Sequence, residues 1–188
     1  MRIVLASASP RRREILSMVC SDFEIRVSSA DESYDSDTPL DQIPKILAQR
    51  KAMAVPIENG EVIIGADTVV IANNTLMGKP KSREEAIAML KAFSGTEHLV
   101  VSGICIRTRD TIYAESVTSK VYMRELSQRE IEKYVDIDEP YDKAGAYGIQ
   151  EMAGAFVSRI DGDFYNIVGL PLCRLTEIFK EKLGVELI

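Results

Sequence analysis

Cysteine and histidine are scarce in this sequence of 188 residues, and tryptophan is absent. The three cysteines, Cys20, Cys105 and Cys173, lie far apart and form no CxxC pair. This spacing argues against a disulfide framework and against a zinc site of the usual kind. Each cysteine lies among apolar residues, so we expect three small buried side chains. The single histidine, His98, has no partner nearby in the sequence and is expected to be structural.

Long apolar segments are also lacking. The apolar start, from Met1 to Ala8, is too short for the core of a signal peptide and runs directly into the polar segment Ser9-Pro10-Arg11. No stretch approaches the roughly 20 apolar residues that span a bilayer. We therefore expect a cytoplasmic protein with no membrane partner.

Positive charge is in deficit, with a net charge of −6 and a sequence pI of about 5.0. Surfaces that follow the phosphates of DNA or RNA are normally basic, so no nucleic-acid partner is expected. An anion site in this chain must be a local group of cations, which favours a small phosphorylated ligand. The hydrophobic fraction of 46% and the charged fraction of 28% are ordinary for a globular protein. The length predicts one domain, residues 1–188, with room for two lobes.

The spacing of apolar residues predicts alternating strands and helices. Strands are expected at residues 3–6, 23–27, 61–72, 98–107, 111–123 and 155–160. Helices are expected at residues 10–19, from a first turn containing Pro44 to about 55, at 83–93, at 128–135 and from about 171 onward. Ser82 and Ser127 each begin a capping-box pattern, and residues 138–155 are expected to form a long loop or short helical turns. The hairpin at 98–123 interrupts a pure βαβ pattern, so the predicted fold is α/β or α+β with a mixed sheet.

Asp67 stands out in the apolar strand predicted at residues 61–72. An ionised carboxylate buried without a partner costs free energy, so a strand this apolar rarely carries one without a role. The favoured interpretation is a metal ligand or a general base. The alternative is a carboxylate that caps a helix or pairs with a buried cation.

Three consecutive arginines, Arg11, Arg12 and Arg13, follow the predicted helix cap Ser9 and Pro10. Free backbone N–H groups at a helix N-terminus favour anions, and guanidinium groups bind phosphate oxygens with two donors. Cations are disfavoured at this end of a helix, so three of them suggest anion binding over helix stability. A solvated basic face is the alternative. Successive helical residues are about 100° apart, so at most two of the three can point into one site.

The other charged residues indicate a binding site only when they are considered together. Asp31 and Glu32 lie in an acidic loop and would usually be solvated, but together with Asp67 they can complete a Mg²⁺ site with oxygen ligands. Lys51 and Lys79 would each, alone, be surface lysines, although the Gly-Lys-Pro sequence restricts the backbone around Lys79.

The glycine-rich segment at residues 142–150 ends in Gln150. Small residues allow a ligand to approach the backbone closely, and the amide of Gln150 can both donate to and accept from the edge of a base. A tight glycine-rich turn is the alternative interpretation.

Taken together, several segments resemble the Maf family, also called septum-formation-inhibitor-like proteins. The matching segments are LASASPRRREIL (5–16), GADTVV (65–70), GKP (78–80), SG followed by the histidine (94–98), DKAGAYGIQ (142–150) and GDFYNIVGLPL (162–172). They occur in family order along almost the whole chain, and their coincidence is far more specific than any one of them.

The resemblance implies a cytoplasmic nucleoside triphosphate pyrophosphatase that uses Mg²⁺ or Mn²⁺, with a plausible homodimer. It also implies a mixed α/β fold with two lobes around a central cleft, similar to the inosine-triphosphatase-like architecture. By position in the family motifs, Asp67 would be the base and, with Glu32, a metal ligand. The residues that would bind substrate are Ser7, Arg11, Arg12, Lys51, Thr68, Lys79 and Gln150, of which Arg12, Thr68 and Gln150 would set specificity.

The form A-Y-G-I-Q resembles the subgroup that acts on dTTP and UTP. One departure is Glu151, where family members commonly carry glycine. Two alternatives remain beside this function: a house-cleaning pyrophosphatase for modified nucleotides, and a regulator of cell division that binds nucleotide without turnover.

Overall fold

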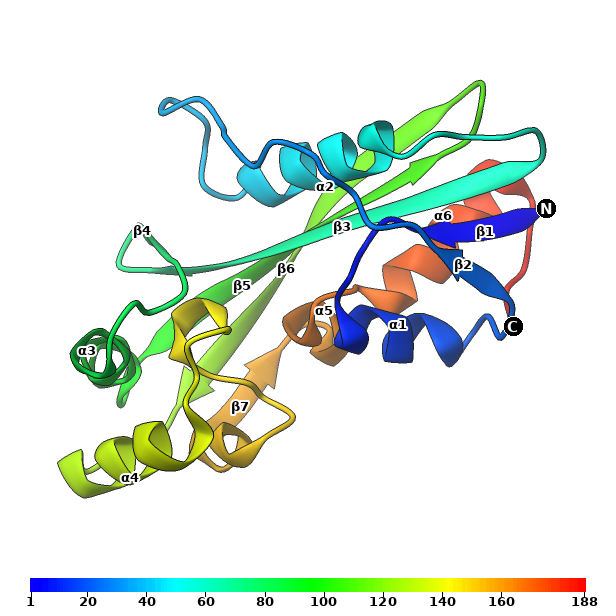
Figure 1. Ribbon diagram of the computed structural model, residues 1–188. Helices are drawn as coiled ribbons and strands as arrows, with labels where there is room; N and C mark the ends of the chain where they lie inside the picture. The colour runs from blue at the N-terminus through cyan, green and yellow to red at the C-terminus, as the bar shows by residue number, and fades with distance from the viewer.

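The computed structural model describes all 188 residues, and its centre is a seven-stranded mixed sheet (Figure 1). The strands are β1 (Arg2–Leu5), β2 (Phe23–Ile25), β3 (Glu61–Ala72), β4 (Thr75–Met77), β5 (Glu97–Arg107), β6 (Ile112–Met123) and β7 (Val157–Asp161). Their order is β2-β1-β3-β5-β6-β7, and β4 pairs with β3. Strand β1 is parallel to β2 and β3, whereas all other pairs are antiparallel. The predicted mixed sheet is confirmed.

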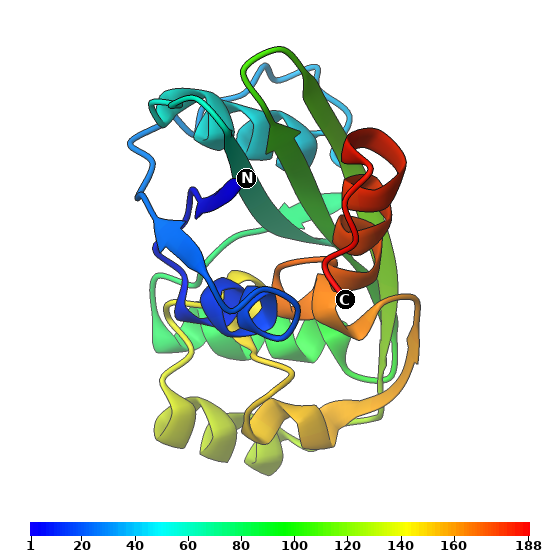
Figure 2. The ribbon, with the colours of Figure 1, turned by 90° about the vertical axis from the view of Figure 1, so that its right-hand side faces the viewer.

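Helices cover both faces of this sheet. They are α1 (Pro10–Ser17), α2 (Ile43–Ala54), α3 (Arg83–Phe93), α4 (Gln128–Asp138), α5 (Phe164–Val168) and α6 (Leu172–Leu183), with short 3₁₀ helices η1 (Ala144–Ala146) and η2 (Met152–Phe156). Figure 1 shows α2 above the long strands and α1 and α5 below them. In the turned view of Figure 2, α2 lies at the top of the molecule and α4 at the bottom. No helix combines the length and the apolar composition needed to cross a membrane.

The helix caps largely follow the sequence. Ser9 accepts the backbone N–H of Arg12, and Pro10 occupies the first turn of α1. Ser127 forms a full capping box with Glu130 at the start of α4. The predicted box at α3 is only half formed, because the carboxylate of Glu85 accepts the N–H of Lys81 instead of that of Ser82.

Two elements escaped the sequence analysis because each is very short. Strand β4 follows a tight turn in which Asn73 and Asn74 both have positive φ, of 49° and 55°, and this geometry matches the twist of a β-hairpin. Helix α5 has five residues, begins where Asp163 accepts the N–H of Tyr165, and ends at Gly169. Neither is long enough to show a periodicity.

Some predicted bounds were wrong by a few residues. Helix α1 ends at Ser17 and not at 19, β2 ends at Ile25 and not at 27, and β7 begins at Val157 because η2 occupies the two residues before it. The cysteine prediction was correct only for Cys105, which is buried. Cys20 is half-buried, and Cys173 is exposed because it lies on the outer side of α6.

The alternation of side chains along the long strands divides the core between the two faces. Even-numbered positions near the start of β3 pack against α1 and α6 in a cluster that includes Val62, Ile64, Ile104, Leu175 and Phe179. Odd-numbered positions face α2 instead, in a cluster that includes Val4, Ala48, Ala52, Ile63 and Cys105. The two faces of this half of the sheet therefore have separate cores.

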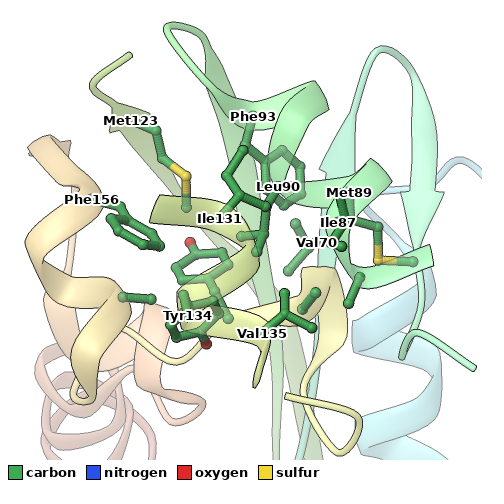
Figure 3. Close-up of a cluster of buried hydrophobic side chains, with 14 of the residues drawn as sticks. Val70, Ile87, Met89, Leu90, Phe93, Met123, Ile131, Tyr134, Val135 and Phe156 are labelled. Atoms are coloured by element: carbon green, nitrogen blue, oxygen red, sulfur yellow. The ribbon is translucent and has the colours of Figure 1, made fainter. Parts of the chain in front are cut away.

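A larger cluster occupies the other end of the long strands, where α3 and α4 cover the sheet. Figure 3 shows Phe93, Ile131, Tyr134 and Phe156 around the centre of this cluster, which also includes Val70 of β3. Tyr134 and Phe156 meet edge to face, with 5.3 Å between ring centroids. This cluster and the α1–α6 cluster lie at opposite ends of the same sheet face, which gives the molecule its two lobes.

His98 belongs to the structure of the α3–α4 lobe, as predicted. It is 2% exposed, its ring stacks on Phe93 with 4.3 Å between centroids, and its Nε2 lies 2.7 Å from the hydroxyl of Tyr147. Burial lowers the pKa of the imidazole to about 4.

This buried imidazole should make the free energy of unfolding depend on pH. The unfolded chain takes up its proton near pH 6.5 and the folded protein only near pH 4, so the unfolded state binds more protons between these values. The free energy of unfolding is therefore highest above pH 6.5 and falls by about 3 kcal/mol as the pH approaches 4. Urea unfolding of the wild type and of His98→Gln at pH 7 and pH 4.5 measures the difference. An equal loss in both proteins would contradict the prediction.

Candidate active site

The candidate site lies along one edge of β3, at a stretch where that edge has no partner strand. Strand β1 pairs with β3 as far as Leu5 opposite Ile64, and β4 resumes pairing only at Met77 opposite Val70. Between these points β3 has a partner strand on its other edge only, namely β5. Side chains from both faces of β3 can therefore reach the same opening, which is where a ligand can approach the middle of the sheet.

The opening is a pocket with a volume of about 460 Å³, within the range of small-molecule sites. Its walls come from α1, the acidic loop before α2, α2 itself, β3, the loop after β4, η1 and the end of α5. The charged and polar residues among its lining are Ser9, Arg11, Arg12, Glu32, Lys51, Asp67, Thr68, Lys79, Asp142, Lys143, Gln150 and Glu151. The pocket lies between the two lobes, as expected from the resemblance.

Asp67 lies on the α2 face of β3, with its side chain 13% exposed. Its Oδ1 is 2.5 Å from Nζ of Lys51 on α2, and the same Nζ is 2.8 Å from Oε1 of Glu32. The Lys51 ammonium lowers the pKa of Glu32. The sequence alternatives for Asp67 included pairing with a buried cation, and the structure shows this pair.

The donor set of this group fits a divalent cation that also binds phosphate. Two carboxylates and one ammonium leave a net charge of −1, and the hydrogen bond from Lys51 to Asp67 uses only Oδ1 of that carboxylate. No group of three or more acidic, histidine or cysteine side chains in the protein is arranged so that it could hold a metal ion by itself. Magnesium usually takes one or two protein carboxylates and completes its shell with phosphate oxygens and water, so two are sufficient. Asp31 is not part of the group, because its carboxylate binds Ser33 outside the pocket.

Arg12 lies on the opposite face of β3 from Asp67. Its Nε donates to the carbonyl oxygen of Gly169 at 2.9 Å, and its Nη1 and Nη2 donate to Ser7 at 3.3 Å and to Thr68 at 3.4 Å. Burial lowers the pKa of the guanidinium, and the negative charges of Asp67 and Glu32 oppose that shift. Ser7 does not line the pocket but accepts hydrogen bonds from two residues that do, Arg12 and the backbone of Ser9.

Arg11 reaches the opposite lobe, from α1 to the segment after η1. Its Nη2 is 3.1 Å from Glu151 and 3.8 Å from Asp142. Glu151 also accepts from the buried Lys143 at 3.1 Å, and Asp142 does so at 3.0 Å. Burial lowers the pKa of Lys143, but its bonds to these two carboxylates outweigh that effect and raise it overall. Glu151, the one departure from the family pattern, therefore links the two lobes across the pocket.

Lys79 and Gln150 are the two predicted residues without a protein partner. Both are exposed side chains on the pocket lining, and neither makes a side-chain hydrogen bond or ion pair. Their polar groups are therefore available to a ligand. Arg13 is exposed and does not line the pocket, in agreement with the limit of two arginines set by helical geometry.

Three residues of this region were not predicted as site residues from the sequence: Lys143, Glu151 and the buried serine Ser102, which lies behind Thr68. A signal existed for Ser102, because it interrupts the apolar run of β5 opposite the point where Thr68 interrupts β3. No sequence signal exists for the contact of Arg11 with Glu151, since the two residues are 140 positions apart.

Comparison with known proteins gives a consistent result over the whole chain. A family model described as "Maf-like protein" matches residues 2–182. The chain is 42% identical to a dTTP/UTP pyrophosphatase of Alkaliphilus metalliredigens, covering 100% of this chain and 99% of the relative. It is 43% identical to one of Clostridium novyi, covering 100% of both chains, and 46% identical to one of Acetivibrio thermocellus, covering 100% and 98%. Among solved structures, the Ham1 protein of Staphylococcus aureus has a TM-score of 0.45 and 14% identity, covering 68% of this chain and 73% of that one.

Proposed function

This chain belongs to the family of Maf-like proteins, and from that membership we propose that it is a nucleoside triphosphate pyrophosphatase acting on dTTP and UTP. The relatives that carry this activity in their names are 42–46% identical over essentially their full length. The observation that supports the proposal most directly is the pocket itself, whose lining combines the buried Asp67 with five cationic side chains, Arg11, Arg12, Lys51, Lys79 and Lys143. We further propose that residues 1–188 form one functional domain, because the pocket takes residues from both lobes.

The cations would bind the triphosphate. At neutral pH the substrate carries several negative charges on its phosphate oxygens, and Arg11, Lys51 and Lys79 have donors that can turn toward them. Lys79 has no protein partner to leave, whereas Arg11 must leave Glu151. Phosphate binding would therefore exchange the contact between the two lobes for a contact with substrate.

Glu32 and Asp67 would hold a Mg²⁺ or Mn²⁺ ion through their carboxylate oxygens, beside the ammonium of Lys51. When bound, such an ion stabilises the negative charge that develops on the phosphate oxygens. The remaining chemistry belongs to Asp67, Lys51 and a water molecule.

In the proposed reaction Asp67 accepts a proton from water as the water oxygen forms a bond to the α-phosphorus. The bond from the α-phosphorus to the oxygen that bridges it to the β-phosphorus breaks, and pyrophosphate leaves with the electron pair of that bond. Lys51 keeps the carboxylate of Asp67 in position through its 2.5 Å contact and adds positive charge beside the phosphates. The products are the nucleoside monophosphate and pyrophosphate.

Base recognition would fall to Arg12, Thr68 and Gln150. Arg12 and Thr68 are held on one wall of the pocket, whereas Gln150 lies on the glycine-rich segment and is free of protein partners. A homodimer and a cytoplasmic location stay predictions.

A pyrophosphate-release screen over the common nucleoside triphosphates tests this function. We expect release from dTTP and UTP with Mg²⁺ or Mn²⁺, loss of release with a chelator, and recovery when either metal is added back. Including 5-methyl-UTP and pseudouridine triphosphate separates a preference for standard nucleotides from house-cleaning of modified ones. Binding of nucleotide with no pyrophosphate from any triphosphate would contradict the proposal and favour the regulator.

A further inference from the structure

A buried row of polar groups lies behind Thr68, on the sheet face shared by the two lobes. Thr68 Oγ1 is 2.7 Å from Oγ of Ser102 on β5, and Ser102 Oγ is 2.8 Å from the backbone oxygen of Asn166 in α5. Ser102 and Asn166 are both 0% exposed. Groups this deeply buried must find their hydrogen-bond partners inside the protein.

Only one placement of hydrogens serves both short contacts. A serine hydroxyl has a single hydrogen, and a carbonyl oxygen can only accept, so Ser102 donates to Asn166 and Thr68 donates to Ser102. If Ser102 donated to Thr68 instead, the oxygens of Ser102 and Asn166 would face each other at 2.8 Å with no hydrogen between them.

The opposite placement would also send the Thr68 hydrogen to the carbonyl oxygen of Gly169. That oxygen is 3.4 Å from Thr68 Oγ1, and it already accepts from Arg12 Nε at 2.9 Å. The direction from Thr68 through Ser102 to Asn166 is therefore the favoured one.

The acceptor at the end of this row is held independently of Thr68. The side-chain amide of Asn166 donates to the carbonyl oxygen of Val100 at 3.0 Å and to Ser119 at 2.9 Å. Ser119 in turn donates to the backbone oxygen of Asp163 at 2.9 Å. The side-chain amide of Asn166 is thus hydrogen-bonded to two strands of the sheet, β5 and β6, so the backbone oxygen of Asn166 is a fixed partner for Ser102.

The consequence is that Thr68 turns its lone pairs, and not its hydrogen, toward the pocket. Beside it, Arg12 uses one N–H on each of its three nitrogens to bind Gly169, Ser7 and Thr68. A guanidinium has five N–H groups, so two remain for a ligand. This wall of the pocket therefore offers a fixed acceptor next to fixed donors.

We infer that Ser102 is a positioning residue that fixes Thr68 as an acceptor and thereby makes the pocket select a base whose ring N–H lies beside a carbonyl oxygen. The imide edge of uracil and thymine has this pattern, with N3–H between two carbonyl oxygens. Cytosine has no hydrogen on N3, so two acceptors would face each other where Thr68 meets the base. This inference rests on the proposed function and names the group that sets its base preference.

The first test uses the wild-type protein and four substrates, with kcat/KM from pyrophosphate release. UTP and 4-thio-UTP keep the N3 hydrogen, whereas CTP and N3-methyl-UTP lack it. We expect the first two to exceed the other two by about 100-fold, because an unpaired acceptor in a buried site is costly. If CTP and N3-methyl-UTP react as fast as UTP, the inference is wrong even when the proposed function holds. If none of the four releases pyrophosphate, the proposed function fails.

The second test compares Ser102→Ala with Ser119→Ala, a matched buried serine in the same network. Without Ser102 the Thr68 hydroxyl can rotate and donate to N3 of cytosine, so the ratio of kcat/KM for UTP to that for CTP should fall about tenfold. Ser119→Ala should lower the melting temperature while leaving that ratio unchanged, because the bond from the Asn166 amide to the carbonyl oxygen of Val100 still holds the acceptor of Ser102. If Ser102→Ala lowers kcat/KM equally for UTP and CTP, or changes only the melting temperature, Ser102 is merely structural and the inference is overturned.

Discussion

Replacing Asp67 with asparagine is expected to lower kcat for dTTP and UTP by about 10³-fold, within the usual contribution of a general base. Asparagine keeps the shape of the side chain but accepts no proton and carries no charge for a metal ion. Lys51 retains its partner Glu32 at 2.8 Å, so its ammonium does not become an unpaired charge. The loss should therefore appear in turnover and not in folding, and steady-state kinetics with thermal unfolding of the same sample measures both.

The matched control for this variant is Asp31→Asn. Asp31 is an exposed carboxylate next to Glu32 in the sequence, but its side chain binds Ser33 outside the pocket. Its replacement should leave kcat within about twofold of the wild type, since surface changes away from a site have small effects. Near-normal turnover by Asp67→Asn would refute the assignment. Titration with Mn²⁺ then separates two roles: unchanged metal affinity indicates a base, and weakened affinity a ligand.

Replacing Gly103 with alanine is expected to destabilise the protein by about 3 kcal/mol, at the upper end of the usual cost of overpacking a core. A Cβ at this position would lie 2.0 Å from the backbone oxygen of Pro44 and 2.3 Å from the backbone nitrogen of Lys45. Both atoms belong to the first turn of α2, so the helix itself would have to move away from the sheet. Urea unfolding of the variant measures the loss.

The same movement should also reach the active site, because α2 carries Lys51. Residue 65 of β3 is the second glycine under this helix, and a Cβ there would lie 2.2 Å from the backbone oxygen of Ala48. The control is Gly78→Ala, where nothing lies within 4 Å of the added carbon, and its stability should stay within about 0.5 kcal/mol of the wild type. Wild-type stability of Gly103→Ala would mean that α2 does not lie as close to β5 as described.

The local features of this protein could be predicted from its sequence because they depend on neighbours within a few positions. Runs of apolar and β-branched residues predicted the long strands, and Ser9, Pro10 and Ser127 predicted where helices begin. Asp67 was recognisable because one charged residue in a long apolar strand contradicts the pattern around it. Strand β4 and helix α5 were missed because three and five residues are too few to show a period.

Only the tertiary structure decided which side chains contact one another in the pocket. Residue chemistry alone could not choose between Asp31 and Glu32, since they are adjacent acidic loop residues. The resemblance pointed to Glu32, and the fold places that residue beside Lys51. The sequence could not predict that Arg11 contacts Glu151, or that Thr68 donates to Ser102, because these contacts join segments far apart in the chain. The opening itself arises where β1 ends before β4 begins, and both strands lie on the same edge of β3. A sequence period specifies which face of a strand a side chain occupies, whereas strand pairing specifies what that side chain meets.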